Sequence, residues 1–176
     1  MNRIILIGNG FDKASDLKTS YEEFILWYFK SIFEGKLKGE SLMEGNLYKD
    51  QLLSIERFKK SINISNKIKE VKDFEELRHL CSINISGFSK GQMYGGAPRV
   101  IIHSNFFKRL LEQKTWGEIE SEYFKDLHDI KSSTYNNTSQ SNSSNNRKKD
   151  ILKLNKDFAF IKDVFSKYIK EVDEQI

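Results

Sequence analysis

A glycine motif close to the start of the chain is the first group of residues whose spacing suggests chemistry. Gly8, Asn9, Gly10, Phe11 and Asp12 follow an apolar run and precede a predicted helix. Glycine permits positive φ angles and lets a ligand approach the backbone, and N–H groups before a helix can hold an anion. The motif therefore predicts a turn that binds the phosphates of a nucleotide, with these five residues as the binding site.

The spacing of the motif departs from the dinucleotide-binding fingerprint, which has a third glycine three residues after the second. Lys13 stands at that position. A tight turn from a strand into a loop, with Asp12 capping the following helix, explains Gly8 and Gly10 as well. Nucleotide binding and a purely structural turn both stay open on these residues alone.

Glu120 is the second candidate, because of its neighbours on a predicted helix. Trp116 precedes it by four residues and Tyr123 follows it by three, so the three side chains share one face, which Leu127 extends. A carboxylate among aromatic side chains is suited to general acid or base catalysis. The alternative, which we favour, is that Glu120 accepts hydrogen bonds from the glycine turn or from Tyr21 and braces the site.

Histidine and cysteine give no sign of a metal centre. His79, His103 and His128 are scattered and lack the i, i+4 spacing of a metal-binding helix. Cys81 is the only cysteine, which excludes an internal disulfide and a cysteine-based zinc site. We expect no metal, and we expect Cys81 to be a small core residue.

The elements that position these residues follow from hydrophobic spacing. Residues 3–7 predict a strand buried on both faces. Ser20 and Glu23 fit a capping box that opens a helix ending near residue 33, and Asp73 fits the N-cap of another. Further helices are expected at residues 51–72, 73–83, 104–113, 115–130 and 149–173, and weak strands at residues 81–85 and 99–103.

Residues 132–146 are almost entirely Ser, Thr, Asn and Gln, with Tyr135 as the exception. Such a segment buries too little apolar area to offset the entropy of ordering it. We expect a flexible polar linker there, inside a single domain that spans residues 1–176.

The small number of predicted strands limits the possible fold classes. A strand buried on both faces needs neighbours, yet only two weak strands accompany the one at residues 3–7. We therefore predict an α/β fold with a Rossmann-like strand, glycine turn and helix at the N-terminus, a mostly helical remainder and an incomplete sheet. The chain would be one domain or the N-terminal part of a larger one.

Amino-acid composition and net charge limit the classes of partner that the chain is expected to bind. The 176 residues include 29 Lys and Arg against 25 Asp and Glu, a net charge of +4 that is spread over several helices. Such a mild excess favours a solvated surface, so nucleic-acid binding is not expected. No apolar run approaches the roughly 20 residues of a membrane span, and a lone cysteine suits a reducing compartment. We expect a cytoplasmic protein without a membrane partner.

Two longer strings carry a resemblance to a known family. "IGNGFD" with "TSYEEF" and, about a hundred residues later, "WGEIESEYFKDL" resemble the AbiH family, bacterial proteins of abortive infection against phage. The matching positions are Ile7, Gly8, Asn9, Gly10, Phe11, Asp12, Thr19, Ser20, Tyr21, Phe24, Trp116, Ile119, Glu120 and Tyr123. The chain departs from the family pattern in its loop, where Lys13, Ser15, Asp16 and Lys18 stand. The resemblance covers most of this chain but only the first half of a family member.

The resemblance implies a role in phage defence. The first motif is also distantly similar to that of SIR2-type NAD-binding proteins, which implies a dinucleotide pocket with Asp12 near a ribose or a polarised water. NAD or another nucleotide is then the expected cofactor or substrate, NAD cleavage the expected activity, and Asp12 and Glu120 the catalytic candidates. The alternative is a helical binding module that senses a phage component or a host protein without catalysis. A homo-oligomer stays open.

Overall fold

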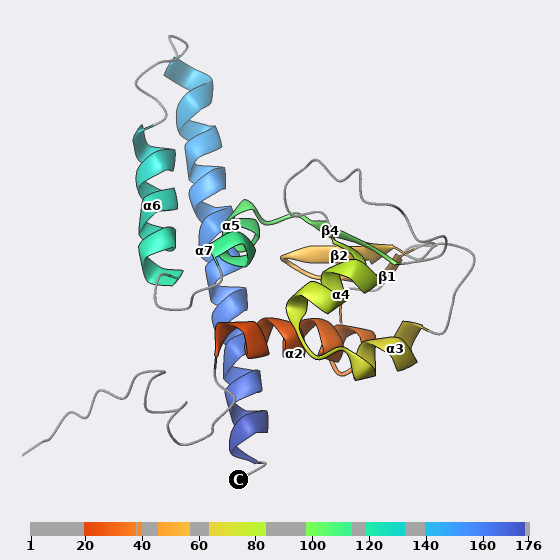
Figure 1. Ribbon diagram of the computed structural model, residues 1–176. Helices are drawn as coiled ribbons and strands as arrows, with labels where there is room; N and C mark the ends of the chain where they lie inside the picture. Colours follow the sequence, from red (N-terminus) through yellow and green to blue (C-terminus); the bar gives the residue numbers. More distant parts are fainter. Residues whose placement is uncertain are drawn as a thin grey trace, which may run out of the picture.

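The computed structural model describes residues 20–37, 39, 46–56, 64–83, 98–113, 119–132 and 140–174 (Figure 1). The strand predicted at residues 3–7, the glycine motif at residues 8–12, Trp116 and the helix start at residue 115 lie outside these ranges. No helix within them is long and apolar enough to cross a membrane.

The first described helix confirms the predicted capping box. Helix α2 spans Tyr21–Phe33. The Glu23 amide donates to Ser20 Oγ at 3.3 Å, and the Ser20 amide donates to Glu23 Oε2 at 2.9 Å. These bonds satisfy two N–H groups that the helix itself leaves without acceptors. The apolar side of α2 is buried with Phe24, Ile25 and Phe29 in the core.

Four short strands form one sheet. They are β1 (Asn46–Lys49), β2 (Leu53–Glu56), β3 (Ser82–Ile83) and β4 (Arg99–Ile102), in the spatial order β1-β2-β4-β3. The pairs β1–β2 and β2–β4 are antiparallel, and β3 runs parallel to β4. The two strands expected near residues 81–85 and 99–103 are therefore confirmed.

The α/β class is confirmed, but a Rossmann-like sheet is not what the described strands form. A Rossmann sheet consists of mostly parallel strands joined by crossover helices. Here β1, β2 and β4 alternate in direction, which is the arrangement of hairpin-type connections. Only β3 and β4 are parallel among the described strand pairs, so the described part of the sheet is not the mostly parallel sheet that the apolar run at residues 3–7 suggested.

The prediction of a helix at residues 51–72 is only partly correct. Its beginning forms β2 instead of a helix, and its later part contains α3 (Ile64–Glu70). The cause is Asp50, which is buried between the hairpin and α2. Its carboxylate accepts hydrogen bonds from the amides of Leu52 and Leu53, at 2.7 and 2.9 Å, and so closes a turn after β1. Leu53 and Ile55 then alternate with Ser54 along an extended strand instead of following a helical stripe.

Two tyrosines complete the hydrogen bonds of Asp50. Tyr28 of α2 donates to Asp50 Oδ2 at 2.5 Å, and Tyr48 of β1 donates to the same oxygen at 2.8 Å. Burial, together with the neighbouring Asp50 charge, raises the pKa of Tyr28 well above its ordinary value, so the phenol stays a donor. Asp50 therefore ties α2 to the β1–β2 hairpin.

Helix α4 (Phe74–Leu80) begins at the predicted N-cap, where Asp73 Oδ1 accepts from the Glu76 amide at 2.8 Å. Cys81 follows directly and is buried in the core, as expected. Burial raises the pKa of the Cys81 thiol to about 12, so the thiol is protonated at pH 8.

We therefore expect Cys81 to resist a disulfide-exchange reagent at pH 8 in the native protein, because the thiolate is the reacting form and the side chain is inaccessible. The reaction should become complete once guanidinium unfolds the chain. A thiol count with a chromogenic disulfide tests this. Stoichiometric reaction within minutes under native conditions would contradict the assigned burial.

Three helices lie to one side of the sheet: α5 (Asn105–Gln113), α6 (Ile119–Ser132) and α7 (Gln140–Asp173). The 34 residues of α7 make a helix roughly 50 Å long. In Figure 1, α6 lies beside the first half of α7, and α2 crosses the second half. The apolar stripe predicted for α7 is confirmed by the buried side chains of Leu154, Ile161 and Tyr168.

Of the segment at residues 132–146, for which a flexible polar linker was predicted, residues 133–139 lie outside the described residues. Ser132 ends α6, and residues 140–146 form the first turns of α7. Adding a residue to an existing helix costs far less than starting one, so the strongly periodic stretch that follows can extend into Ser and Asn residues.

Candidate functional site

The predicted site residues are only partly described. Gly8, Asn9, Gly10, Phe11 and Asp12 lie outside the described residues. Glu120 is exposed in the first turn of α6. Within the described ranges, Glu120 forms no hydrogen bond or ion pair.

The neighbours predicted for Glu120 have other roles. Tyr123 stacks on Phe158 of α7, with ring centroids 4.6 Å apart, and its hydroxyl donates to Asn155 Oδ1 at 2.7 Å. Tyr21 begins α2 and is buried there, where desolvation raises its pKa. The hydrogen bond proposed between Glu120 and Tyr21 is not formed.

A cavity of about 240 Å³ lies where α2 and α4 begin. We call it the α2–α4 cavity. Its lining consists of Tyr21, Glu22, Ile25, Asp73, Phe74, Glu75 and Leu111. None of these described residues is basic, and three carry carboxylates, so the cavity repels a phosphate. The α2–α4 cavity is therefore not suited to hold the phosphates of a nucleotide.

A serine and a histidine meet on adjacent strands. Ser54 Oγ and His103 Nε2 lie 2.8 Å apart, a distance typical of a nucleophile and its base. Ser54, however, is only 5% exposed and lines neither cavity described here. The described residues also include no carboxylate hydrogen-bonded to His103. The hydrogen bond between the two side chains links β2 to the residue that follows β4.

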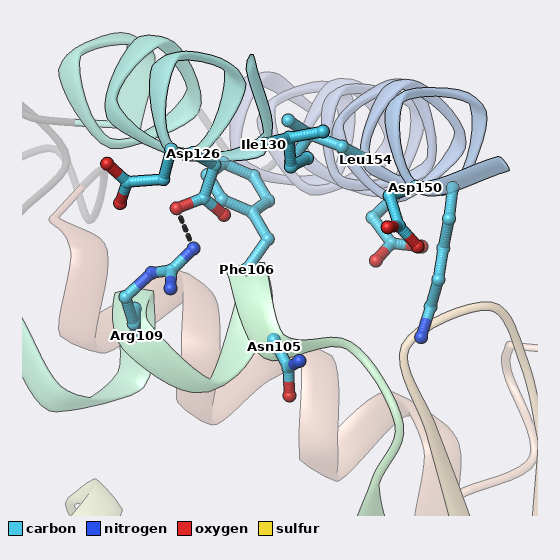
Figure 2. Close-up of a pocket in the computed structure, with 10 residues that line it drawn as sticks. Asn105, Phe106, Arg109, Asp126, Ile130, Asp150 and Leu154 are labelled. Atoms are coloured by element: carbon cyan, nitrogen blue, oxygen red, sulfur yellow. Dashed lines mark ion pairs between the residues drawn. The ribbon is translucent and has the colours of Figure 1, made fainter. Parts of the chain in front are cut away.

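A second cavity, of about 330 Å³, lies between α5, α6 and α7 (Figure 2). We call it the three-helix cavity. Its apolar lining consists of Phe106, Ile130 and Leu154, and its polar lining of Asn105, Arg109, Asp126, Asp129, Asp150, Lys153 and Asp157. Figure 2 shows Asp126 and Asp150 on different sides of the cavity, with Ile130 and Leu154 on the helices above it.

The charges around the three-helix cavity are unequal. Four aspartates line it against two basic residues, which leaves a formal excess of two negative charges. Arg109 forms an ion pair with the buried Asp126, and Lys153 donates to the carbonyl oxygen of His103 at 3.1 Å. Each cation thus has one polar partner, while Arg109 Nε has no acceptor among the described residues. The described lining carries more carboxylates than cations, so its formal charge is negative.

The residues of this cavity were missed in the sequence, although one signal was present. Asp157 lies three residues after Leu154, which places it on the apolar stripe of α7. A charge on a buried stripe is unusual unless it is paired. Asp126 of α6 gave no comparable signal, because its partner Arg109 comes from a different helix.

The described residues contain no group of three or more His, Cys, Asp or Glu side chains that could hold a metal ion. Comparison of the chain with protein-family models, with curated proteins and with solved structures finds no match.

Proposed function

We propose that this chain is a phage-defence protein of the AbiH kind, in which the glycine motif at residues 8–12 binds a nucleotide. The observation that carries the proposal is the occurrence of two separated motifs in the family order, "IGNGFD" with "TSYEEF" and then "WGEIESEYFKDL". NAD is the proposed nucleotide, and its cleavage would stop the growth of an infected cell.

The start of α2 supports the proposal locally. The Ser20 capping box begins a helix at Tyr21, nine residues after Asp12, the last residue of the motif. The motif residues Tyr21 and Phe24 are buried, so the second half of the first motif anchors the helix in the core. The Rossmann-like strand and glycine turn would then precede an anchored helix, which is the order that a phosphate-binding unit needs.

The proposed roles of the individual residues follow from the resemblance. Gly8, Asn9, Gly10 and Phe11 form the binding turn, and Asp12 lies near a ribose or an attacking water. Glu120 remains the second proposed catalytic residue, and its exposure on α6 leaves the carboxylate accessible to a ligand.

Plaque counts on cells that carry Gly10→Val or Asp12→Ala test the proposal. Valine removes the conformational freedom of the turn and fills the space for a phosphate, so protection should fall to the level of cells without the protein. Asp16→Ala, in the same loop but outside the motif, is the matched control and should protect fully. Unchanged protection by both motif variants would overturn the nucleotide mechanism.

Thermal melting of the purified chain provides the direct binding test. A ligand that binds only the folded state must raise the melting temperature, so NAD, ATP and ADP-ribose are compared at equal concentration. The ligand that stabilises the wild type should leave the Gly10→Val variant unaffected. A cooperative melt with no shift for any of the three would contradict nucleotide binding.

A helical binding module is the second candidate function. The observation that favours it is the exposure of Phe124 on α6 and Leu152 on α7, at 63% and 50%, on helices that extend beyond the sheet (Figure 1). Contiguous exposed apolar patches mark contact surfaces, and these two side chains are the large hydrophobic residues that are exposed in the described part of the chain. A Phe124→Ser, Leu152→Ser variant that loses protection, while Gly10→Val keeps it, would select this function.

A further inference from the structure

Asp157 is a buried carboxylate to which the described residues supply no cationic partner. It is 2% exposed, and its Oδ1 accepts one hydrogen bond from Gln51 Nε2 at 2.6 Å. Within the part of the chain that the structure describes, no other hydrogen bond and no ion pair reaches it. A neutral amide does not compensate the charge, and an uncompensated charge in a protein interior is costly.

The residues around Asp157 supply no cation to it. Arg109 is paired with Asp126, and Lys153, one turn before Asp157, is directed to the backbone of His103. Asp150 lies on the same face of α7, two turns before Asp157. The side of the three-helix cavity formed by α7 therefore presents two carboxylates that are not neutralised.

The form of the cavity indicates which cation would fit. The backbone positions of Asp150 and Asp157 are separated by about 10 Å along the axis of α7, since each residue of a helix rises about 1.5 Å. Leu154 lies between them in sequence, and Ile130 and Phe106 complete an apolar wall. A ligand with ammonium groups at both ends and methylene groups between them matches this arrangement of charge and apolar surface.

We propose that the three-helix cavity binds a linear aliphatic polyamine. One ammonium group pairs with Asp157, a second pairs with Asp150, and the methylene chain lies against Leu154 and Ile130. Binding supplies the counter-charge that Asp157 lacks within the protein. The polyamine proposal does not depend on the nucleotide function proposed above.

Calorimetric titration of the full chain with spermidine, at moderate salt, tests the proposal. Asp157→Asn keeps an acceptor for Gln51 but removes the charge, and Asp150→Asn changes an exposed position. Each substitution is expected to weaken spermidine binding about tenfold or more. The matched control is Asp163→Asn, an exposed aspartate of the same helix that pairs with Lys167 outside the cavity.

Two further ligands separate a shaped site from general attraction to an acidic surface. Magnesium chloride, at the ionic strength of the spermidine solution, should not compete beyond ordinary screening. N-acetyl-lysine methylamide, which carries one ammonium group like a lysine side chain of a partner protein, should bind much more weakly than spermidine. Equal affinity for both amines would overturn the polyamine assignment in favour of a protein lysine.

The melting temperatures of the wild type and the variants, with and without spermidine, distinguish a binding role of Asp157 from a purely structural one. Without polyamine, Asp157→Asn should melt at or above the temperature of the wild type, because it removes an unpaired buried charge. Spermidine should raise the melting temperature of the wild type and of Asp163→Asn only. If Asp157→Asn does not fold, Asp150→Asn decides alone. Absence of spermidine binding to the wild type, or equal binding to Asp150→Asn, would overturn the proposal.

Discussion

Replacing Asp50 with alanine is expected to lower the free energy of unfolding by about 4 kcal/mol. Four donors lose their acceptor at once: the hydroxyls of Tyr28 and Tyr48 and the amides of Leu52 and Leu53. Each hydrogen bond to a charged group contributes roughly 1.5–3 kcal/mol, and buried donors without an acceptor add a desolvation cost. The hairpin and α2 are both affected, because Asp50 connects them.

Urea unfolding followed by circular dichroism measures this effect. Tyr48→Phe is the graded control, since it removes one of the four donors and should cost about 1 kcal/mol. Asp50→Asn should fall between the two variants, because its single carbonyl oxygen cannot serve all four donors. A loss below 1 kcal/mol for Asp50→Ala would show that Asp50 does not hold the hairpin to α2.

Replacing Phe24 with alanine is expected to cost about 3–5 kcal/mol. Phe24 is 2% exposed and lies at the crossing of α2 and α7. Its ring meets Phe165 edge-on at 5.4 Å and lies 5.6 Å from Tyr168, both on α7. The substitution leaves a cavity between two helices that cannot close without moving α7 along its whole length.

Phe124→Ala is the matched control, because the exposed Phe124 belongs to no core cluster and its loss should change stability by less than about 0.5 kcal/mol. Equal stability of the two variants in urea would contradict the assigned packing of α7 on α2. Phe24 is also a residue of the first family motif. A loss of phage protection in Phe24→Ala must therefore be compared with the amount of folded protein before it is assigned to ligand binding.

Local signals in the sequence were sufficient where an element is stabilised by its own residues. The capping box of α2 and the Asp73 cap of α4 are formed within four residues of chain, so the pattern alone predicted both helix starts. The stripe of α7 and the burial of Cys81 were predicted for the same reason, since helical periodicity and residue type indicate the buried face directly.

Tertiary contacts decided the elements that the sequence analysis missed. The strand at Leu53–Glu56 depends on Asp50, whose donors come from α2 and β1 as well as from its own turn. The apolar residues after Asp50 fit both a helical and an extended spacing. The hydrogen bonds of Asp50 and the pairing of β2 with β1 and β4 select the extended form. The antiparallel order of the sheet is likewise set by pairing between strands that are distant in sequence.

The sequence by itself determined the α/β class, the starts of α2 and α4, the apolar face of α7 and the motifs on which the proposed function rests. The tertiary structure alone decided the sheet order and the three-helix cavity. The physical reason is the separation in sequence of the interacting residues. Helix caps and apolar stripes arise from residues a few positions apart. The ion pair of Arg109 with Asp126 and the hydrogen bond of Gln51 to Asp157 instead join separate elements. No spacing within one helix reveals that Asp157 is buried without a cation.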